Sequence, residues 1–152
     1  MSGDPDDIRG WQRLDRATTT SGRIEPGDPA RLAAIGVRHV INLALDDHPE
    51  ALADEAARLA AEGIGYTHIP VPFDAPGADH FAAFEAALAA ASGPVHVHCI
   101  MNWRVSAFFY RRNRAAGMSE DEAGALLRQQ WDPRGSDDPR ARVWAAFLAG
   151  GE

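Results

Sequence analysis

Short apolar segments with strand character alternate with segments of helical spacing along the middle of the chain, and this order restricts the fold more than any other feature. The predicted strands span 37–45, 66–71 and 95–98, and the predicted helices span 50–62, the region of Phe81, Phe84 and Leu88, and the region after Arg104. Strands that alternate with helices favour a parallel sheet covered by helices. We therefore predict an α/β fold with a central, mainly parallel sheet flanked by helices.

The two ends of the chain extend this pattern into one domain. Residues 1–20 are polar and are predicted to be a partly ordered N-terminal segment, docked through Trp11 and Leu14. Residues 21–150 are predicted to form a single folded domain, because no repeat, linker or low-complexity tract divides them. The further predicted elements are an extended piece at 20–24 and helices at 28–35, 119–131 and 139–149.

The charge and the cysteine content exclude several classes of function. The chain of 152 residues carries a formal net charge of −7, so nucleic acid and anionic membranes, which reward clustered positive charge, are not expected partners. No apolar run approaches the ~20 residues that span a bilayer, and the acidic, polar start is unlike a secretory signal, so we expect a cytoplasmic protein. The single cysteine forms no intrachain disulfide and is therefore either core filler or a reactive thiol.

The segment from Val95 to Ser106 has the pattern strand, tight loop, helix, with Cys99 where the strand ends and Arg104 where the helix begins. A loop that enters a helix presents unpaired N–H groups around one point, and these groups favour an anion. A thiolate is stabilised at such a place, and a guanidinium fits two oxygens of a tetrahedral oxyanion. The sequence therefore predicts an anion-binding loop with Cys99 as the candidate nucleophile. The loop comprises Ile100, Met101, Asn102, Trp103 and Arg104.

The order of motifs over most of residues 20–131 resembles that of the cysteine-based protein tyrosine and dual-specificity phosphatases, in particular their bacterial dual-specificity-like branch. The motifs are Ser21-Gly22-Arg23-Ile24, Leu32-Ala33-Ala34-Ile35-Gly36-Val37, Val40-Ile41-Asn42-Leu43, the stretch from Tyr66 to Val71 followed by Asp74 and Pro76, and His98-Cys99 with Arg104. The resemblance implies the protein tyrosine phosphatase fold of dual-specificity type, and hydrolysis of phosphoesters through a cysteinyl-phosphate intermediate. It implies no metal or other cofactor, and it implies a phosphorylated protein or a small phosphorylated molecule as the partner.

The resemblance also implies a role for each matching residue. Cys99 would attack phosphorus, and Arg104 would hold the phosphoryl oxygens, while His98 would orient the loop and keep Cys99 ionised. Asp74 would protonate the leaving oxygen, with Asp79 as the second candidate for this acid. Phosphate or sulfate is expected to bind in the loop.

The loop departs from the phosphatase pattern in three ways. The phosphatases place five residues between Cys and Arg, whereas this chain places four. Asn102 is expected to replace the missing loop glycine, because Asn tolerates a positive φ. Val105 stands where the phosphatases carry Ser or Thr, and Ser106 is expected to substitute from the next position.

Two other functions are open at the level of sequence. A loop one residue shorter than that of the phosphatases looks like the loop of the rhodanese sulfurtransferases, whose Cys carries a sulfane sulfur. The third function is that of a catalytically weak or inactive pseudophosphatase, which would bind phosphorylated ligands through Arg104 and the loop amides. The sequence leaves the substrate open between phosphotyrosine, phosphoserine or phosphothreonine and a metabolite, and it leaves the oligomeric state open.

Structural roles compete with catalytic ones at several of these residues. Cys99 could be a small buried hydrophobe, and Asp74 lies near prolines where Asp is a common turn former. His96 and His98 alternate along a predicted strand and share a face, while Cys99 points the other way. These three residues therefore do not predict a zinc site, which takes four ligands in its structural form.

Overall fold

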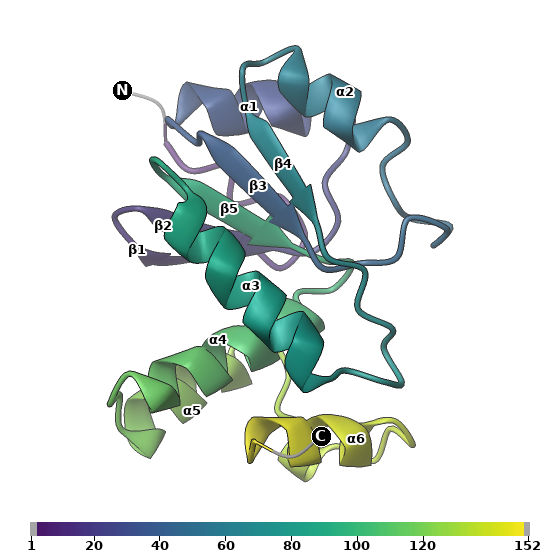
Figure 1. Ribbon diagram of the computed structural model, residues 1–152, viewed down its shortest axis with the longest axis vertical. Coiled ribbons are helices and arrows are strands. Elements are labelled where there is room, and N and C mark those ends of the chain that lie inside the picture. The colour runs from purple at the N-terminus through teal and green to yellow at the C-terminus, as the bar shows by residue number, and fades with distance from the viewer. Residues whose placement is uncertain (1–2, 151–152) are drawn as a thin grey trace.

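A five-stranded sheet forms the centre of the computed structural model, which describes residues 3–150 (Figure 1). The strands are β1 (Gln12–Asp15), β2 (Thr18–Ser21), β3 (His39–Asn42), β4 (Gly65–His68) and β5 (Val95–His98). The helices are α1 (Asp28–Ala34), α2 (Glu55–Ala60), α3 (Ala78–Ala90), α4 (Trp103–Ala115), α5 (Glu120–Arg128) and α6 (Ala141–Leu148), and a 3-10 turn, η1, spans Pro133–Gly135. The predicted α/β class is confirmed.

The strand order is β1-β2-β5-β3-β4, with β5 at the centre. β2 and β3 both pair with β5 in parallel, and β4 pairs with β3 in parallel. β1 runs antiparallel to β2 at one edge. Ligands of open, mainly parallel sheets bind beyond the carboxyl ends of the strands. Because Cys99 directly follows β5, it lies in the middle of this edge.

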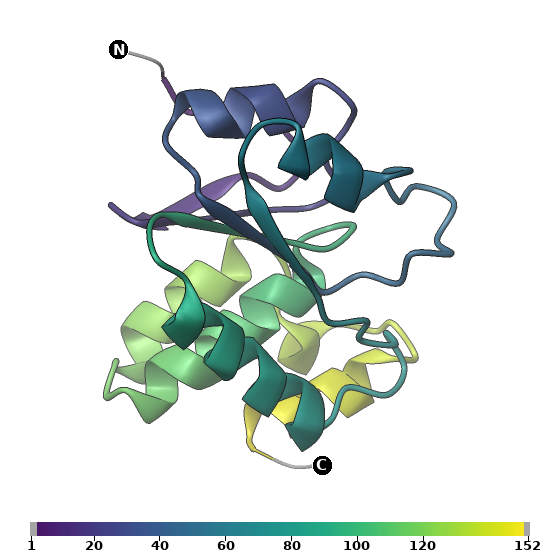
Figure 2. The same ribbon diagram turned by 45° about the horizontal axis from the view of Figure 1, so that its top comes forward.

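Helices cover both faces of the sheet. α1 and α2 lie on one face, and α3, α4, α5 and α6 lie on the other (Figures 1 and 2). Successive residues of β3 show the division, since Val40 packs with Leu32 and Leu59 whereas Ile41 belongs to the larger core that contains Phe84. Alternate side chains of β3 thus enter two separate hydrophobic cores, as expected for a strand covered by helices on both faces.

Several predicted elements are present in the structure, and local features mark where they begin or end. β5 has the predicted span, and Gly36 follows the end of α1 with a φ of +90°, a conformation that glycine adopts without steric cost. Ser119 caps α5, because its Oγ accepts a hydrogen bond from the Glu122 N–H at 3.2 Å. The predicted strand at 37–45 and the predicted helix at 50–62 are shorter in the structure, where they form β3 and α2.

The hairpin of β1 and β2 was not foreseen, because the sequence predicted only an extended piece at 20–24. β1 is a short edge strand of largely polar sequence, and its backbone pairs with β2. Leu14 is the residue through which it packs against the larger core. A four-residue edge strand held mainly by backbone hydrogen bonds has no alternating apolar pattern to detect.

Ser119→Ala is expected to lower the free energy of unfolding by about 0.5–2 kcal/mol, because the Glu122 amide loses its acceptor at the start of α5. Urea unfolding at equilibrium measures this difference. Ser92→Ala is the matched control, since Ser92 is an exposed loop residue. Equal stabilities of the two variants would contradict the capping role.

Candidate active site

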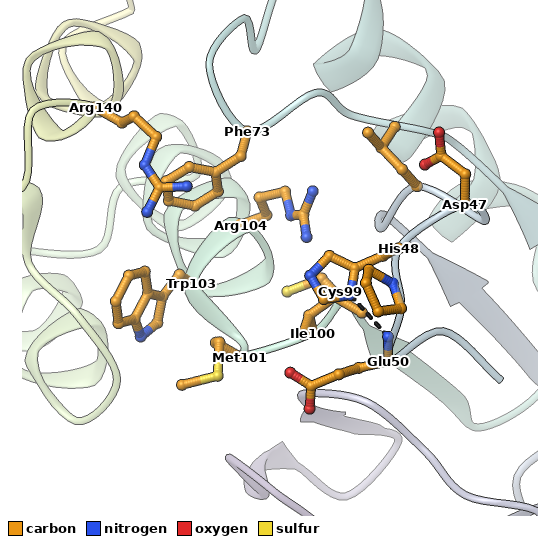
Figure 3. Close-up of a pocket in the computed structure, with 12 residues that line it drawn as sticks. Asp47, His48, Glu50, Phe73, Cys99, Ile100, Met101, Trp103, Arg104 and Arg140 are labelled. Atoms are coloured by element: carbon orange, nitrogen blue, oxygen red, sulfur yellow. Dashed lines mark hydrogen bonds between the residues drawn. The ribbon is translucent and has the colours of Figure 1, made fainter.

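Cys99 lines a cavity of about 530 Å³ at the carboxyl edge of the sheet. Its amide donates to the Ser21 carbonyl at 3.3 Å and so prolongs the pairing of β5 with β2 by one residue. Cys99 as a whole is only 1% exposed, so the sulfur is almost completely enclosed. The cavity is lined by Leu45, Asp47, His48, Pro49, Glu50, Phe73, Cys99, Ile100, Met101, Trp103, Arg104 and Arg140 (Figure 3).

The backbone amides between Cys99 and Ser106 determine what this edge of the sheet can bind. Within residues 3–150, the N–H groups of 100–105 donate to no backbone carbonyl, whereas the N–H of Ser106 donates to the Asn102 carbonyl at 3.0 Å. These unpaired donors occur where the loop turns into α4, so the positive end of the helix dipole adds to them. An oxyanion is therefore favoured at this place.

Asn102 holds the loop in its tight curve. Its φ is +68°, as the sequence predicted for the residue in place of the family's glycine, and its side chain is fully buried. Nδ2 donates to the Gly10 carbonyl at 2.7 Å and to Thr20 Oγ1 at 3.0 Å. Ser106 Oγ donates to Asn102 Oδ1 at 3.0 Å, so the Ser106 hydroxyl supports Asn102 and does not line the cavity.

Gly22 lets the chain after β2 approach the loop. A Cβ at this position would lie 2.3 Å from the Ile100 carbonyl oxygen, a distance that no side chain can occupy. The amide of the next residue, Arg23, donates to the same oxygen at 2.8 Å. The absence of a side chain at Gly22 is thus what allows this hydrogen bond to fix the first residue of the loop.

Arg104 is buried and lines the cavity together with Cys99. Nη1 donates to the Val71 carbonyl at 2.9 Å, and the guanidinium carbon lies 5.6 Å from the centre of the Phe73 ring. Figure 3 shows the guanidinium and the Cys99 sulfur on the same cavity. The bond to Val71 uses one of the five N–H donors and orients the group, which leaves further donors for an oxyanion.

His98 lies behind the loop and does not line the cavity. Nδ1 is 3.1 Å from the Cys99 carbonyl oxygen, and Nε2 is 2.6 Å from Glu55 Oε2. Both side chains are buried. His98 therefore contacts Cys99 through the Cys99 backbone, and its role in orienting the loop stays a prediction.

Aromatic side chains form one side of the cavity. Phe73 and Trp103 line it, and Trp131 stacks on Trp103 with ring centres 4.6 Å apart. The Arg140 guanidinium lies 4.3 Å above the Phe73 ring and pairs with Asp138 at 2.9 Å. Arg140 lowers the pKa of Asp138 to about 2 by hydrogen bonding, so this pair is ionised at neutral pH. The wall is therefore apolar with a neutralised charge at its rim.

The loop after β3 forms the facing wall, which sequence reasoning missed. Asp47, His48 and Glu50 line the cavity, and the Glu50 amide donates to His48 Nδ1 at 3.0 Å. Glu50 in turn forms ion pairs with Arg9 and Arg23, which fasten this loop to the N-terminal segment and to the chain just after β2. The sequence did contain one sign of this wall, because polar residues follow a predicted parallel strand. Ligand-binding residues gather at the carboxyl ends of such strands.

The two candidate acids lie outside the lining of the cavity. Asp74 is exposed and directly follows Phe73, which does line it. Asp79 is exposed in the first turn of α3. The structure thus brings Cys99 and Arg104 to one cavity with three of the loop residues, and it leaves both acids and Ser106 beside that cavity. The three loop residues are Ile100, Met101 and Trp103.

Among residues 3–150, no group of three or more His, Cys, Asp or Glu side chains is arranged to hold a metal ion. No helix in that range combines the length and the apolar character needed to cross a bilayer.

The family model of the beta-lactamase hydrolase-like protein, phosphatase-like domain, matches residues 11–119 of the chain. These residues run from β1 to just past α4 and include the whole loop from Cys99 to Arg104. Among curated protein sequences, none matches the chain.

Solved structures of phosphatases have the same fold. A DUF442 candidate phosphatase from Shewanella putrefaciens CN-32 matches with a TM-score of 0.79 and 26% identity over 98% of each chain. TpbA from P. aeruginosa matches with a TM-score of 0.72 and 21% identity over 100% of this chain and 89% of its own. The core catalytic domain of the PP-IP phosphatase SIW14 from S. cerevisiae matches with a TM-score of 0.75 and 13% identity over 95% of this chain and 88% of its own. The predicted phosphatase-like fold is confirmed.

Gly22→Ala is expected to weaken the binding of inorganic phosphate by about tenfold or more, because the new methyl group displaces the Ile100 carbonyl and with it the loop. Isothermal titration calorimetry measures the affinity. Gly27→Ala is the matched control, since a Cβ there meets nothing within 4 Å and the backbone φ is an ordinary −82°. Equal affinities of the two variants would contradict the role of Gly22.

Proposed function

Because the chain belongs to the family of the beta-lactamase hydrolase-like protein, phosphatase-like domain, we propose that it hydrolyses phosphoesters through a cysteinyl-phosphate intermediate on Cys99. The observation that carries this proposal is that Cys99 and Arg104 line one cavity, on a loop whose amides of 100–105 find no backbone acceptor within residues 3–150. The same donors that bind phosphoryl oxygens also stabilise a thiolate, so binding and activation of the nucleophile have one cause.

In the first step the Cys99 thiolate attacks phosphorus, so that an S–P bond forms and the bond from phosphorus to the leaving oxygen breaks. Arg104 and the loop amides hold the non-bridging oxygens, over which the charge of the transition state is spread. An acid gives its proton to the leaving oxygen, which contributes about 10²–10⁴-fold to the rate.

In the second step a water molecule attacks phosphorus, the S–P bond breaks, and Cys99 leaves as the thiolate. The group that gave its proton in the first step takes one from this water, and inorganic phosphate is released. Two steps of this kind replace one more difficult displacement.

We assign the acid to Asp74, with Asp79 as the alternative. Asp74 is exposed on the segment between β4 and α3, and its neighbour Phe73 lines the cavity. Asp47 lines the cavity directly, from the opposite wall. Because Asp47 is closer to the cavity than Asp74, a variant of Asp47 is needed to test whether Asp74 is the acid.

The aromatic wall of Phe73 and Trp103 favours a flat leaving group, since aromatic rings pack well against one another. TpbA has been solved in complex with pTyr and SIW14 in complex with citrate. These complexes support a phosphorylated or otherwise anionic ligand, and we propose an aryl phosphoester, either on a protein or on a small molecule.

Hydrolysis of p-nitrophenyl phosphate tests the function. The wild-type protein is expected to release phosphate, and Cys99→Ser is expected to abolish the release. Sulfur transfer from thiosulfate to cyanide, without release of phosphate, would instead indicate a rhodanese-like enzyme. Phosphate binding without either turnover, lost in Arg104→Ala, would indicate a pseudophosphatase.

Asp74→Asn is expected to lower kcat for an aryl phosphate with a poor leaving group by about 10²-fold, because the leaving oxygen no longer receives a proton. The rate of Cys99 alkylation by iodoacetate is expected to stay unchanged, since Asp74 does not touch the thiol. Asp47→Asn and Asp79→Asn are the matched variants. A loss of rate in one of these, with Asp74→Asn as active as the wild type, would move the acid to that residue.

A further inference from the structure

Two acceptor groups hold the ring of His98 from opposite sides. The Cys99 carbonyl oxygen faces Nδ1 at 3.1 Å, and the Glu55 carboxyl group faces Nε2 at 2.6 Å. A carbonyl oxygen cannot donate a hydrogen bond, and a carboxylate oxygen cannot either. Each ring nitrogen of His98 therefore needs a proton of its own unless the Glu55 carboxyl group carries one.

Glu55 lies in the first turn of α2, where the positive end of the helix dipole favours a carboxylate. Asn42 Oδ1 accepts a hydrogen bond from the Ala44 amide at 2.9 Å, and this fixes which end of the Asn42 amide turns towards Glu55. The Nδ2 end then donates to Glu55 Oε1 at 3.4 Å and to the Tyr66 hydroxyl at 3.1 Å. Burial raises the pKa of Tyr66 to about 12, so this phenol stays neutral and adds no second anion to the cluster.

We infer that Glu55 is a positioning residue that holds His98 as an imidazolium, with the cationic ring next to Cys99 and the carboxylate on the far side of it. A buried charge is tolerated when a hydrogen-bonded partner of opposite sign accompanies it, and here both side chains are at most 6% exposed. The pair is neutral as a whole, but its positive end is the one that touches Cys99. It therefore stabilises the thiolate more than an uncharged ring would.

His96 provides a contrast on the same strand. Its ring centre is 6.3 Å from that of His98, but its nitrogens meet the hydroxyl groups of Thr19 and Ser21, each at 2.8 Å. Ser21 Oγ donates to the Gly22 carbonyl, so it accepts from His96 Nε2 and leaves Nδ1 to accept from Thr19. Burial lowers the pKa of His96 well below its usual range, and the charge of His98 lowers it further. His96 is thus the neutral Nε2–H form.

The groups that face His98 come from three elements. Glu55 of α2 contacts the ring directly, and the neutral His96 of β5 stacks beside it. The neutral Tyr66 of β4 is linked to Glu55 through Asn42, which donates to both. Glu55 is the one carboxylate in hydrogen-bond contact with the ring among residues 3–150. The effect on Cys99 chemistry rests on the proposed function, whereas the protonation of His98 does not.

NMR spectra of the ¹⁵N-histidine-labelled protein at neutral pH test the inference. In the wild-type protein His98 is expected to give the signals of a ring protonated on both nitrogens, while His96 gives those of the neutral Nε2–H form in the same spectrum. In Glu55→Gln, His98 is expected to change to a neutral form, because an amide can donate to Nε2. Signals of a neutral His98 in the wild-type protein would overturn the inference, even if Glu55→Gln failed to fold.

The second readout is the rate of Cys99 alkylation by iodoacetate at pH 6, which needs no phosphatase turnover. Glu55→Gln is expected to slow it about tenfold, and Glu55→Asp, which keeps the carboxylate, is expected to retain most of the rate. Glu62→Gln is the matched control, since Glu62 is exposed just after α2. Equal rates for Glu55→Gln and Glu62→Gln would overturn the role of Glu55. If the wild-type protein releases no phosphate but the NMR signals and the slower alkylation of Glu55→Gln are as expected, the proposed function fails and the inference stands.

Discussion

The tight curve of the backbone between Cys99 and Arg104 is the constraint on which the rest of the site depends. Asn102 stabilises the curve, because its buried side-chain amide donates hydrogen bonds to the N-terminal segment and to β2. It is held from the side by the hydrogen bond between the Arg23 amide and Ile100, which is possible because Gly22 has no side chain. These contacts come from segments far apart in the sequence, so the loop is shaped by the fold and not by its own residues alone.

The charges around the loop follow from this shape. The unpaired amides and Arg104 offer positive potential on the side of the cavity, and the inferred imidazolium of His98 offers it from behind. A chain with a net charge of −7 thus concentrates positive potential at one point, where the proposed reaction would bring a thiolate and a phosphoryl group together. The anionic residues nearby are mostly neutralised, Glu50 by two arginines and Asp138 by Arg140.

The sequence predicted the parts of this account that depend on local pattern. The alternation of strands and helices, the place of Cys99 at the end of β5 and the positive φ of Asn102 can all be read within a few neighbouring residues. Glu55 lies 43 residues before His98, and no periodicity connects them, because their contact exists only after β3 and β5 have paired. The loop after β3 escaped prediction for the same reason, since its residues become a wall of the cavity only through the tertiary fold.

The covalent intermediate is the most direct test of the central claim. The protein is mixed with an aryl phosphate, quenched in acid within the first turnovers, digested and examined by mass spectrometry. The account predicts one phosphoryl group on the peptide that contains Cys99, which disappears as substrate is exhausted. Continued release of phosphate with no such adduct, or the same rate of release from Cys99→Ser, would contradict it.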